Sequence, residues 1–160
     1  MPLDQVSNAA PPVDPVVHPE TEPFWHGIAV GELRVQRCTR CGTHRFPFGP
    51  VCFRCLSFDY TWEPLGGNGT VAVAAVVRRA TGDKAWEPYV PFISGLVDLE
   101  HGLRLPGRIL CTCGAATRRG TEVHAVVLTA PGRSDVHGFM HSCIPSPSDG
   151  HDLRQGNVRP

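Results

Sequence analysis

The sequence has no long apolar run, a single lysine and few aromatic residues. No stretch approaches the roughly 18–20 apolar residues of a transmembrane helix. Residues 1–23 contain neither the basic region nor the apolar core of a secretory signal, so we expect a cytoplasmic chain without a membrane anchor. Aromatic residues make up 8% of the chain and are scattered, which argues against the stacking surface of a protein that binds single-stranded nucleic acid.

An excess of charge of one sign is also absent. The 160 residues carry 15 basic and 15 acidic side chains, so the formal net charge is zero. This balance does not supply the broad positive surface that nucleic-acid binding requires. The charges are nevertheless segregated, because residues 1–33 contain five acidic residues and no lysine or arginine, whereas residues 34–54 contain five arginines and no acidic residue.

The chain is rich in residues that break helices. Its 17 glycines and 16 prolines form about a fifth of the sequence, which excludes a helix bundle and favours short strands joined by turns. Gly107 is expected to form a bulge, and residues 113–121 a turn or one helical turn. Five short strands are typical of an OB-type barrel, although the pattern alone also fits other small β-barrels. The segments with a strand pattern are residues 70–79, 91–99, 103–111, 122–129 and 136–140.

Seven cysteines in a cytoplasmic chain indicate metal binding before disulfides. Four of them form two Cys-x-x-Cys pairs, Cys38 with Cys41 and Cys52 with Cys55, separated by ten residues. Four thiolates complete a tetrahedral site, so the metal has no open position and its role is structural. Zinc is the expected ion, although an iron site of the rubredoxin type has the same ligands. His44 lies between the pairs, but the four cysteines already suffice.

No sequence motif specifies an active site. The HExxH, GxSxG, P-loop and GxGxxG patterns are all missing. Cys113 could serve as a nucleophile with His124 or His137 as its base, but a buried, inert cysteine is the simpler interpretation. Cys111 and Cys143 are interpreted in the same way. No catalytic residue is therefore assigned.

The arginines that follow the acidic segment allow two interpretations. They either solvate a small metal-binding lobe or form a positive face for phosphates, those of a nucleic acid or of coenzyme A. Two further arginines at the end of the first barrel strand would extend such a face. The candidate contacts to coenzyme A phosphates or to a partner are Arg37, Arg40, Arg45, Arg54, Arg78 and Arg79.

Together these features resemble a known family. The matching positions are Phe24-Trp25, Arg37-Cys38-x-x-Cys41-Gly42, Phe46-Pro47, Cys52-x-x-Cys55, Trp62, Gly67-x-Gly69-Thr70-Val71, Pro88-Tyr89 and Gly102-x-Arg104-x-x-Gly107. Over roughly residues 22–130, the sequence resembles the acyl-CoA-associated OB-fold and zinc-ribbon family, catalogued as domain of unknown function 35.

The resemblance implies a mainly β fold: a short N-terminal helical segment, a rubredoxin-like zinc ribbon and a five-stranded OB-fold barrel. The composition before and after these parts favours a disordered arm and a flexible tail. The expected boundaries are residues 1–20 for the arm, 21–36 for the helical segment and its lead-in strand, 37–63 for the ribbon, 64–143 for the OB-fold domain and 144–160 for the tail.

The resemblance also implies a partner, because such proteins accompany thiolase-like enzymes. We expect a non-catalytic accessory or scaffold subunit of a thiolase, aldolase or acyltransferase-type hetero-oligomer. It would hold structural Zn²⁺ and help to frame an acyl-CoA site used in forming or cleaving carbon–carbon bonds, with the coenzyme A thioester as a shared ligand. Phe24 and Trp25 are expected to be exposed and to anchor the partner. The alternative is an OB-fold and zinc-ribbon module that binds single-stranded nucleic acid.

Overall fold

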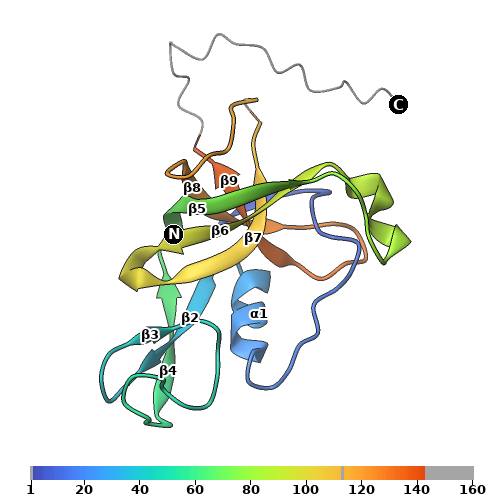
Figure 1. Cartoon of the computed structure of the whole chain (residues 1–160). Helices are drawn as coiled ribbons and strands as arrows, with labels where there is room; N and C mark the ends of the chain where they lie inside the picture. Colours follow the sequence, from blue (N-terminus) through green and yellow to red (C-terminus); the bar gives the residue numbers. More distant parts are fainter. Residues whose placement is uncertain (1, 113, 143–160) are drawn as a thin grey trace.

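The computed structural model describes residues 2–112 and 114–142 (Figure 1). The predictions made for Cys113, Cys143 and residues 144–160 lie outside the described residues. Within the described ranges, no helix is long and apolar enough to cross a membrane. In chain order the elements are β1 (Asp4–Val6), α1 (Glu22–Ala29), β2 (Leu33–Cys38), β3 (His44–Arg45), β4 (Tyr60–Leu65), β5 (Asn68–Val77), the 3₁₀-helix η1 (Lys84–Tyr89), β6 (Phe92–Leu99), η2 (Glu100–Gly102), β7 (Arg104–Leu110), β8 (Glu122–Leu128) and β9 (Val136–His141).

Five strands close into a barrel. They are hydrogen-bonded in the order β8–β5–β6–β7–β9, and β9 also pairs with β8, which closes the ring. The pair β7–β9 is parallel, whereas the other barrel pairs are antiparallel. This is the strand order of an OB-fold, with β5 to β9 as its first to fifth strands. The predicted mainly β fold with a five-stranded OB barrel is confirmed.

The ribbon is a separate three-stranded sheet with the order β3–β2–β4, placed at the lower end of the molecule in Figure 1. Helix α1 precedes it. Thr21 occupies the N-cap position and Pro23 lies in the first turn, where its fixed φ suits a helix. The Thr21 hydroxyl, however, donates to the carbonyl of His18 and caps no helical N–H. The helix continues through Gly27 to Ala29.

Ribbon, helix and barrel share one hydrophobic core. Ile28 of α1 and Val35 of β2 are completely buried, and they belong to the same cluster as Val97 and Leu105 of the barrel. Burying a side chain of this kind contributes roughly 1.5–3 kcal/mol. Because the cluster runs without a break from the helix into the barrel, the stability of the ribbon is coupled to that of the barrel.

The predicted disordered arm is wrong for residues 2–20. β1 pairs in parallel with Val126–Leu128 of β8. The amides of Ala9 and Ala10 then donate to the carbonyl of Thr129, at 3.0 and 3.3 Å. The cause is an open edge, because β5 pairs with β8 only as far as His124 and leaves one side of the rest of β8 for the arm. These backbone hydrogen bonds and the burial of Ala9 and Ala10 offset the conformational entropy that the arm loses when it is ordered.

The predicted bulge at Gly107 is also wrong. Gly107 lies opposite Gly95 in a regular ladder, and the irregularity in the barrel falls in β5 between Val71 and Val73. Gly107 has a packing role instead, because a Cβ atom there would lie 2.7 Å from the ring of Phe139. Among residues 114–121, a turn is present and no helix.

Candidate metal centre

The first cysteine loop begins where β2 ends. The amide of Cys38 donates to the carbonyl of Thr43 at 2.9 Å, and the amide of Gly42 donates back to the carbonyl of Cys38 at 2.8 Å. Gly42 has a φ of 72°, a conformation that glycine adopts without steric cost. The tight turn brings Cys41 back toward Cys38, which explains the glycine that follows the second cysteine.

The second cysteine loop repeats this hydrogen-bond pattern. The amide of Cys52 donates to the carbonyl of Ser57 at 2.8 Å, and the amide of Leu56 donates to the carbonyl of Cys52 at 2.9 Å. Leu56 takes the position of the glycine and has a φ of 60°. A side chain in this left-handed region costs roughly 1–2 kcal/mol. The loop therefore holds Leu56 in an unfavourable conformation in order to present Cys52 and Cys55 to the same point.

The four sulfur atoms lie close enough together to bind one metal ion. Sγ of Cys38 is 3.6 Å from Sγ of Cys55, and Sγ of Cys41 is 3.7 Å from Sγ of Cys52. All four lie within 4.8 Å of one another. A tetrahedral zinc ion with Zn–S bonds of about 2.3 Å requires sulfur atoms about 3.8 Å apart. The donor set and spacing fit zinc, and in the described part of the chain no other group of histidine, cysteine or acidic residues forms such a cluster.

Thiolate formation is favoured at one ligand in particular. Oγ1 of Thr43 lies 3.2 Å from Sγ of Cys41, and hydrogen bonds with the side chain and backbone of Thr43 lower the pKa of Cys41 to about 6. A thiolate is the form that binds the metal. When zinc is bound to all four cysteines it has no free position for substrate, so its chemistry here is to cross-link the two loops.

The candidate arginines do not form one face. Arg37 donates to Oε1 of Glu63 at 3.2 Å and this bond lowers the pKa of that carboxyl group, so Arg37 has a counter-ion within the ribbon. Arg40 and Arg54 are exposed on the two cysteine loops. Arg78 and Arg79 are exposed as well, but they follow β5 on the barrel.

Arg45 cannot contact a phosphate. Its side chain is 2% exposed, and its guanidinium carbon lies 4.8 Å from the centre of the Tyr60 ring. None of its three guanidinium nitrogens has a hydrogen-bond partner among the described residues. The prediction failed because the cross-strand pairing of Arg45 with Gln36 directs the side chain into the ribbon, where an aromatic face replaces water.

The predicted aromatic anchor is not an exposed pair. Phe24 is 2% exposed and packs against Phe48, with ring centres 5.0 Å apart. Trp25 is half-buried, and its ring centre lies 4.9 Å from that of Phe24. The two residues are adjacent on α1, so the helix turns Phe24 into the shared core and leaves Trp25 at its margin. Phe24 is therefore a core residue.

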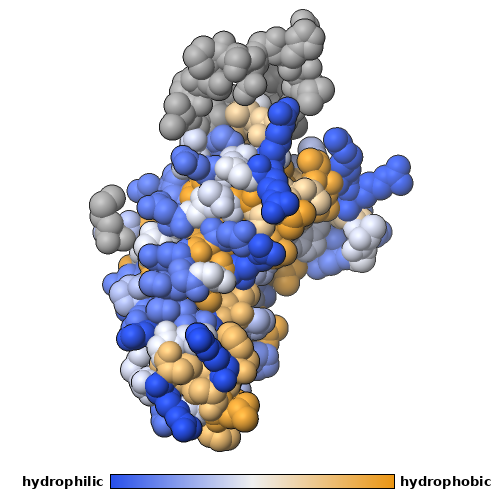
Figure 2. Space-filling model, turned by 60° about the vertical axis from the view of Figure 1, so that its left-hand side comes forward, coloured by the Kyte–Doolittle hydropathy of each residue, from blue (hydrophilic) through white to orange (hydrophobic). Residues whose placement is uncertain are grey.

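Exposed apolar side chains occur instead on the second cysteine loop. Phe53, Leu56 and Phe58 are 72%, 72% and 70% exposed, and Val51 is 38% exposed. We call these four residues the ribbon patch. Figure 2 shows apolar surface at the lower end of the molecule, where the ribbon lies. A signal for it was present in the sequence, because a loop built around a metal has no interior in which the apolar residues between its ligands can be buried.

The ligand-binding face of the barrel is covered by the arm. In OB-folds, ligands bind across the second and third strands, between the loops that join strands one and two and strands four and five. In this chain that face is β6–β7, and residues 9–15 cross it. Ala9 accepts a hydrogen bond from Nη1 of Arg108 at 3.2 Å, and Asp14 accepts one from the amide of Ser134 at 2.8 Å.

Two histidines make the fold sensitive to acid. His137 donates from Nε2 to the carbonyl of Pro106 at 2.8 Å, but burial keeps the pKa of His137 below its ordinary value of 6.5. Burial and the neighbouring His101, stacked on it at 4.0 Å, lower the pKa of His44 in the same way. Below pH 6.5 the unfolded chain binds protons that the folded chain does not, so acid favours unfolding.

We therefore expect the free energy of unfolding to be steady above about pH 6.5 and to fall below it. Each histidine contributes a slope of at most about 1.4 kcal/mol per pH unit. Urea denaturation across this range measures the slope. His137→Gln should reduce it. An unchanged slope in His137→Gln contradicts the assignment.

Comparison with known proteins agrees with this architecture, that of a rubredoxin-like ribbon joined to an OB-fold. Residues 25–61 match the family model described as "ChsH2, rubredoxin-like zinc ribbon domain", and residues 62–128 match "ChsH2, C-terminal OB-fold domain". The chain belongs to this ChsH2, or DUF35, family.

Two curated relatives are similar to more than half of this chain. The chain is 33% identical over 112 residues to the "3-oxo-4,17-pregnadiene-20-carboxyl-CoA hydratase alpha subunit" of Mycobacterium tuberculosis, covering 70% of this chain and 35% of that protein. It is 32% identical over 91 residues to the "DUF35 domain-containing scaffold protein" of Methanocaldococcus jannaschii, covering 56% of this chain and 63% of that protein. The chain thus spans only about a third of the mycobacterial subunit.

Solved structures give the same result. A chain of the "Ltp2-ChsH2(DUF35) aldolase" superposes with a TM-score of 0.71 at 26% identity, covering 81% of this chain and 99% of that one. A DUF35 family protein of unknown function from Sulfolobus solfataricus superposes with a TM-score of 0.50 at 13% identity, covering 69% and 78%, which shows the shared fold.

Proposed function

We propose that the protein is a non-catalytic, zinc-containing accessory subunit that binds a thiolase-like enzyme and helps to frame its acyl-CoA site. The observation that carries the proposal is the match over 99% of a chain of the "Ltp2-ChsH2(DUF35) aldolase", together with a cluster of four cysteines that would close a metal site. A closed site holds loops in place and offers no position to a substrate. The reacting groups then belong to the partner.

The relatives support a role in acyl-CoA metabolism. The mycobacterial relative is named as a subunit of a hydratase acting on a coenzyme A thioester, and the archaeal relative as a scaffold. In this chain Arg40 and Arg54 present guanidinium groups on the exposed cysteine loops, where they can meet the phosphates of a coenzyme A thioester shared with the partner. The four metal thiolates favour a reducing compartment, and we place the complex in the cytoplasm.

The alternative of nucleic-acid binding is disfavoured by the covered barrel face. Single strands bind OB-folds across the second and third strands, through stacked bases and a positive groove. Here the arm is hydrogen-bonded over that face, and its line of contact is apolar, with Pro11, Val13 and Pro15 turned toward the barrel. A nucleic acid would have to displace this segment of the chain.

Co-expression with a thiolase-like protein from the same organism tests the proposal. An affinity tag on this chain should retain that enzyme at a fixed ratio through size-exclusion chromatography. The enzyme should also become more soluble or more active toward its acyl-CoA substrate than when it is produced alone. A chain that elutes alone and leaves both properties unchanged contradicts the proposal. Salt-sensitive binding of fluorescent oligonucleotides would favour the alternative.

A further inference from the structure

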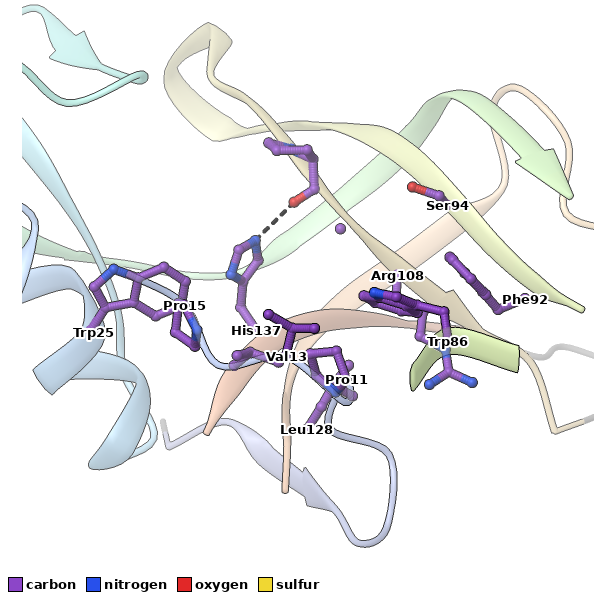
Figure 3. A pocket seen from close by; sticks show the side chains of 13 residues that line it. Pro11, Val13, Pro15, Trp25, Trp86, Phe92, Ser94, Arg108, Leu128 and His137 are labelled. Carbon is purple, nitrogen blue, oxygen red and sulfur yellow. Dashed lines mark hydrogen bonds between the residues drawn. The ribbon is translucent and has the colours of Figure 1, made fainter. Parts of the chain in front are cut away.

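The ligand-binding face of the barrel contains a pocket that the proposed function does not use. Its volume is about 350 Å³, which lies within the range of roughly 300–1,000 Å³ found for small-molecule sites. The arm, α1, η1 and the strands of the barrel all contribute walls. Figure 3 shows Trp25 on one side, Trp86 and Phe92 on the other, and His137 between them. The walls are therefore mainly aromatic and aliphatic.

One cation lies in this apolar setting. Arg108, on β7, is half-buried, and its guanidinium carbon lies 5.7 Å from the centre of the Phe92 ring. Nη1 is hydrogen-bonded to the carbonyl of Ala9, but Nε is buried without a partner. Within residues 2–112 and 114–142, no carboxylate forms an ion pair with Arg108. A partly desolvated guanidinium of this kind favours an anion beside it.

The remaining polar groups limit the size of that anion. His137 uses Nε2 to donate to Pro106, and burial keeps its ring neutral at physiological pH, so it adds no second charge. Ser94, opposite Arg108 in the β6–β7 ladder, contributes a neutral hydroxyl group. A single positive charge in an apolar cavity matches one carboxylate, and it is too little for a diphosphate or for the backbone of a nucleic acid.

We propose that this pocket binds a small apolar carboxylate, with its head group on Arg108 and its hydrocarbon part between Trp25 and Trp86. The site belongs to this chain alone and does not depend on the partner enzyme. Its occupant is held by burial of hydrocarbon against the aromatic walls and by one charge-assisted contact. The arm forms part of the wall, so the bound molecule also stabilises the arm on the barrel.

Decanoate is a suitable probe, and the protein contains its own reporters. Trp25 and Trp86 line the pocket, whereas Trp62 lies in the ribbon. Titration of the zinc-loaded full chain with decanoate should change the tryptophan fluorescence in a saturable manner, with one site per chain. Trp86→Phe should remove much of the signal. Decan-1-ol, which has the same chain and no charge, should bind at least about tenfold more weakly.

Substitutions locate the site. Arg108→Met keeps an unbranched apolar stem and removes the charge, so it should weaken decanoate binding at least about tenfold, whereas Arg79→Met, at an exposed arginine outside the pocket, should not change it. Ser94→Phe fills the space beside Arg108 and should abolish the saturable binding of decanoate. Zinc content and circular dichroism confirm the fold of each variant.

Each outcome decides for or against the pocket. The proposal is overturned if decanoate gives no saturable change, if Arg108→Met binds as tightly as the unaltered chain, or if Arg79→Met weakens binding equally. If Arg108→Met does not fold, the comparison of decanoate with decan-1-ol on the unaltered chain decides, and equal affinities overturn the proposal. Because no partner is present in these measurements, their failure leaves the accessory function untouched, and a failure of co-purification leaves the pocket untouched.

Discussion

A chain carrying Cys55→Ser is expected to lose its metal and to precipitate on expression. Sγ of Cys55 lies 3.6 Å from Sγ of Cys38, so serine at position 55 removes one of the four ligands and leaves three thiolates. Structural zinc sites contribute on the order of 10–16 kcal/mol of apparent binding free energy, which is comparable to the whole stability of a domain. Elemental analysis of the soluble fraction should show about one zinc ion per unaltered chain and far less in the variant.

Cys111→Ser is the matched control. Cys111 lies outside the cysteine cluster and its Sγ is 3.5 Å from the carbonyl of Ala115, a contact that a serine hydroxyl group also makes. This variant should keep its zinc and its solubility. A soluble, well-folded and metal-free Cys55→Ser chain contradicts a structural metal. A red-coloured unaltered chain that contains iron would retain the four-cysteine site but contradict zinc as its ion.

The loss should spread beyond the ribbon. Ile28, Val35 and Leu65 lie in one core cluster with the barrel, and β4 leads into β5 with only two residues between them. Without the metal, the loops between β2 and β4 have few apolar contacts of their own, so the sheet that contributes Leu33, Val35 and Leu65 to this cluster loses its support. In thermal unfolding experiments, a chelator should therefore lower the melting temperature of the barrel as well as that of the ribbon.

The metal ligands could be predicted because their signal is local. Two Cys-x-x-Cys pairs specify both loops through spacing alone, and the glycine after Cys41 indicates the left-handed turn that closes the first loop. The barrel strands could be predicted for a similar reason, since β-branched runs and alternation are properties of short segments. Their closure into an OB-fold came from a resemblance, because nothing in a single strand specifies its neighbour.

The errors concern interactions between distant segments. The arm has the composition of a disordered segment, and only the open edge of β8, more than 100 residues away in sequence, gives β1 a partner. The sequence predicts Arg45 to be a surface cation, but its pairing with Gln36 directs the side chain into the ribbon. Phe24 and Trp25 were interpreted as one unit, although a helix places adjacent residues about 100° apart, so one is core and the other is not. The wall of the barrel pocket likewise joins residues from the arm and from six helices and strands, and it has no sequence motif.

The ribbon patch exposes apolar surface to water, which is unfavourable unless a partner buries it. Phe53, Leu56 and Phe58 expose about 70% of their area each, within or beside one loop that is closed by backbone hydrogen bonds at Cys52. Aromatic side chains on a rigid support lose little conformational entropy on binding, and they are typical of interface hot spots. Arg54 is exposed on the same loop. We infer that this patch is the surface that docks on the thiolase-like enzyme.

The triple variant Phe53→Ser, Leu56→Ser and Phe58→Ser is expected to abolish co-purification with that enzyme while the chain remains folded. Each apolar anchor in an interface centre contributes about 2 kcal/mol or more, so the three together should raise the dissociation constant at least about 100-fold. Their exposure means that the fold loses little when they are replaced. Zinc content, melting temperature and binding to the immobilised enzyme measure the two effects separately.

Val73→Ser combined with Val76→Ser provides the matched control. These valines are 52% and 49% exposed on β5, so the control removes apolar surface of the barrel and leaves the ribbon intact. It should bind the enzyme like the unaltered chain. If instead the ribbon variant binds normally and the β5 variant does not, the docking surface lies on the barrel, and the apolar ribbon patch needs another explanation. If both variants bind normally while the unaltered chain co-purifies, neither patch carries the interface, although the accessory function itself stands.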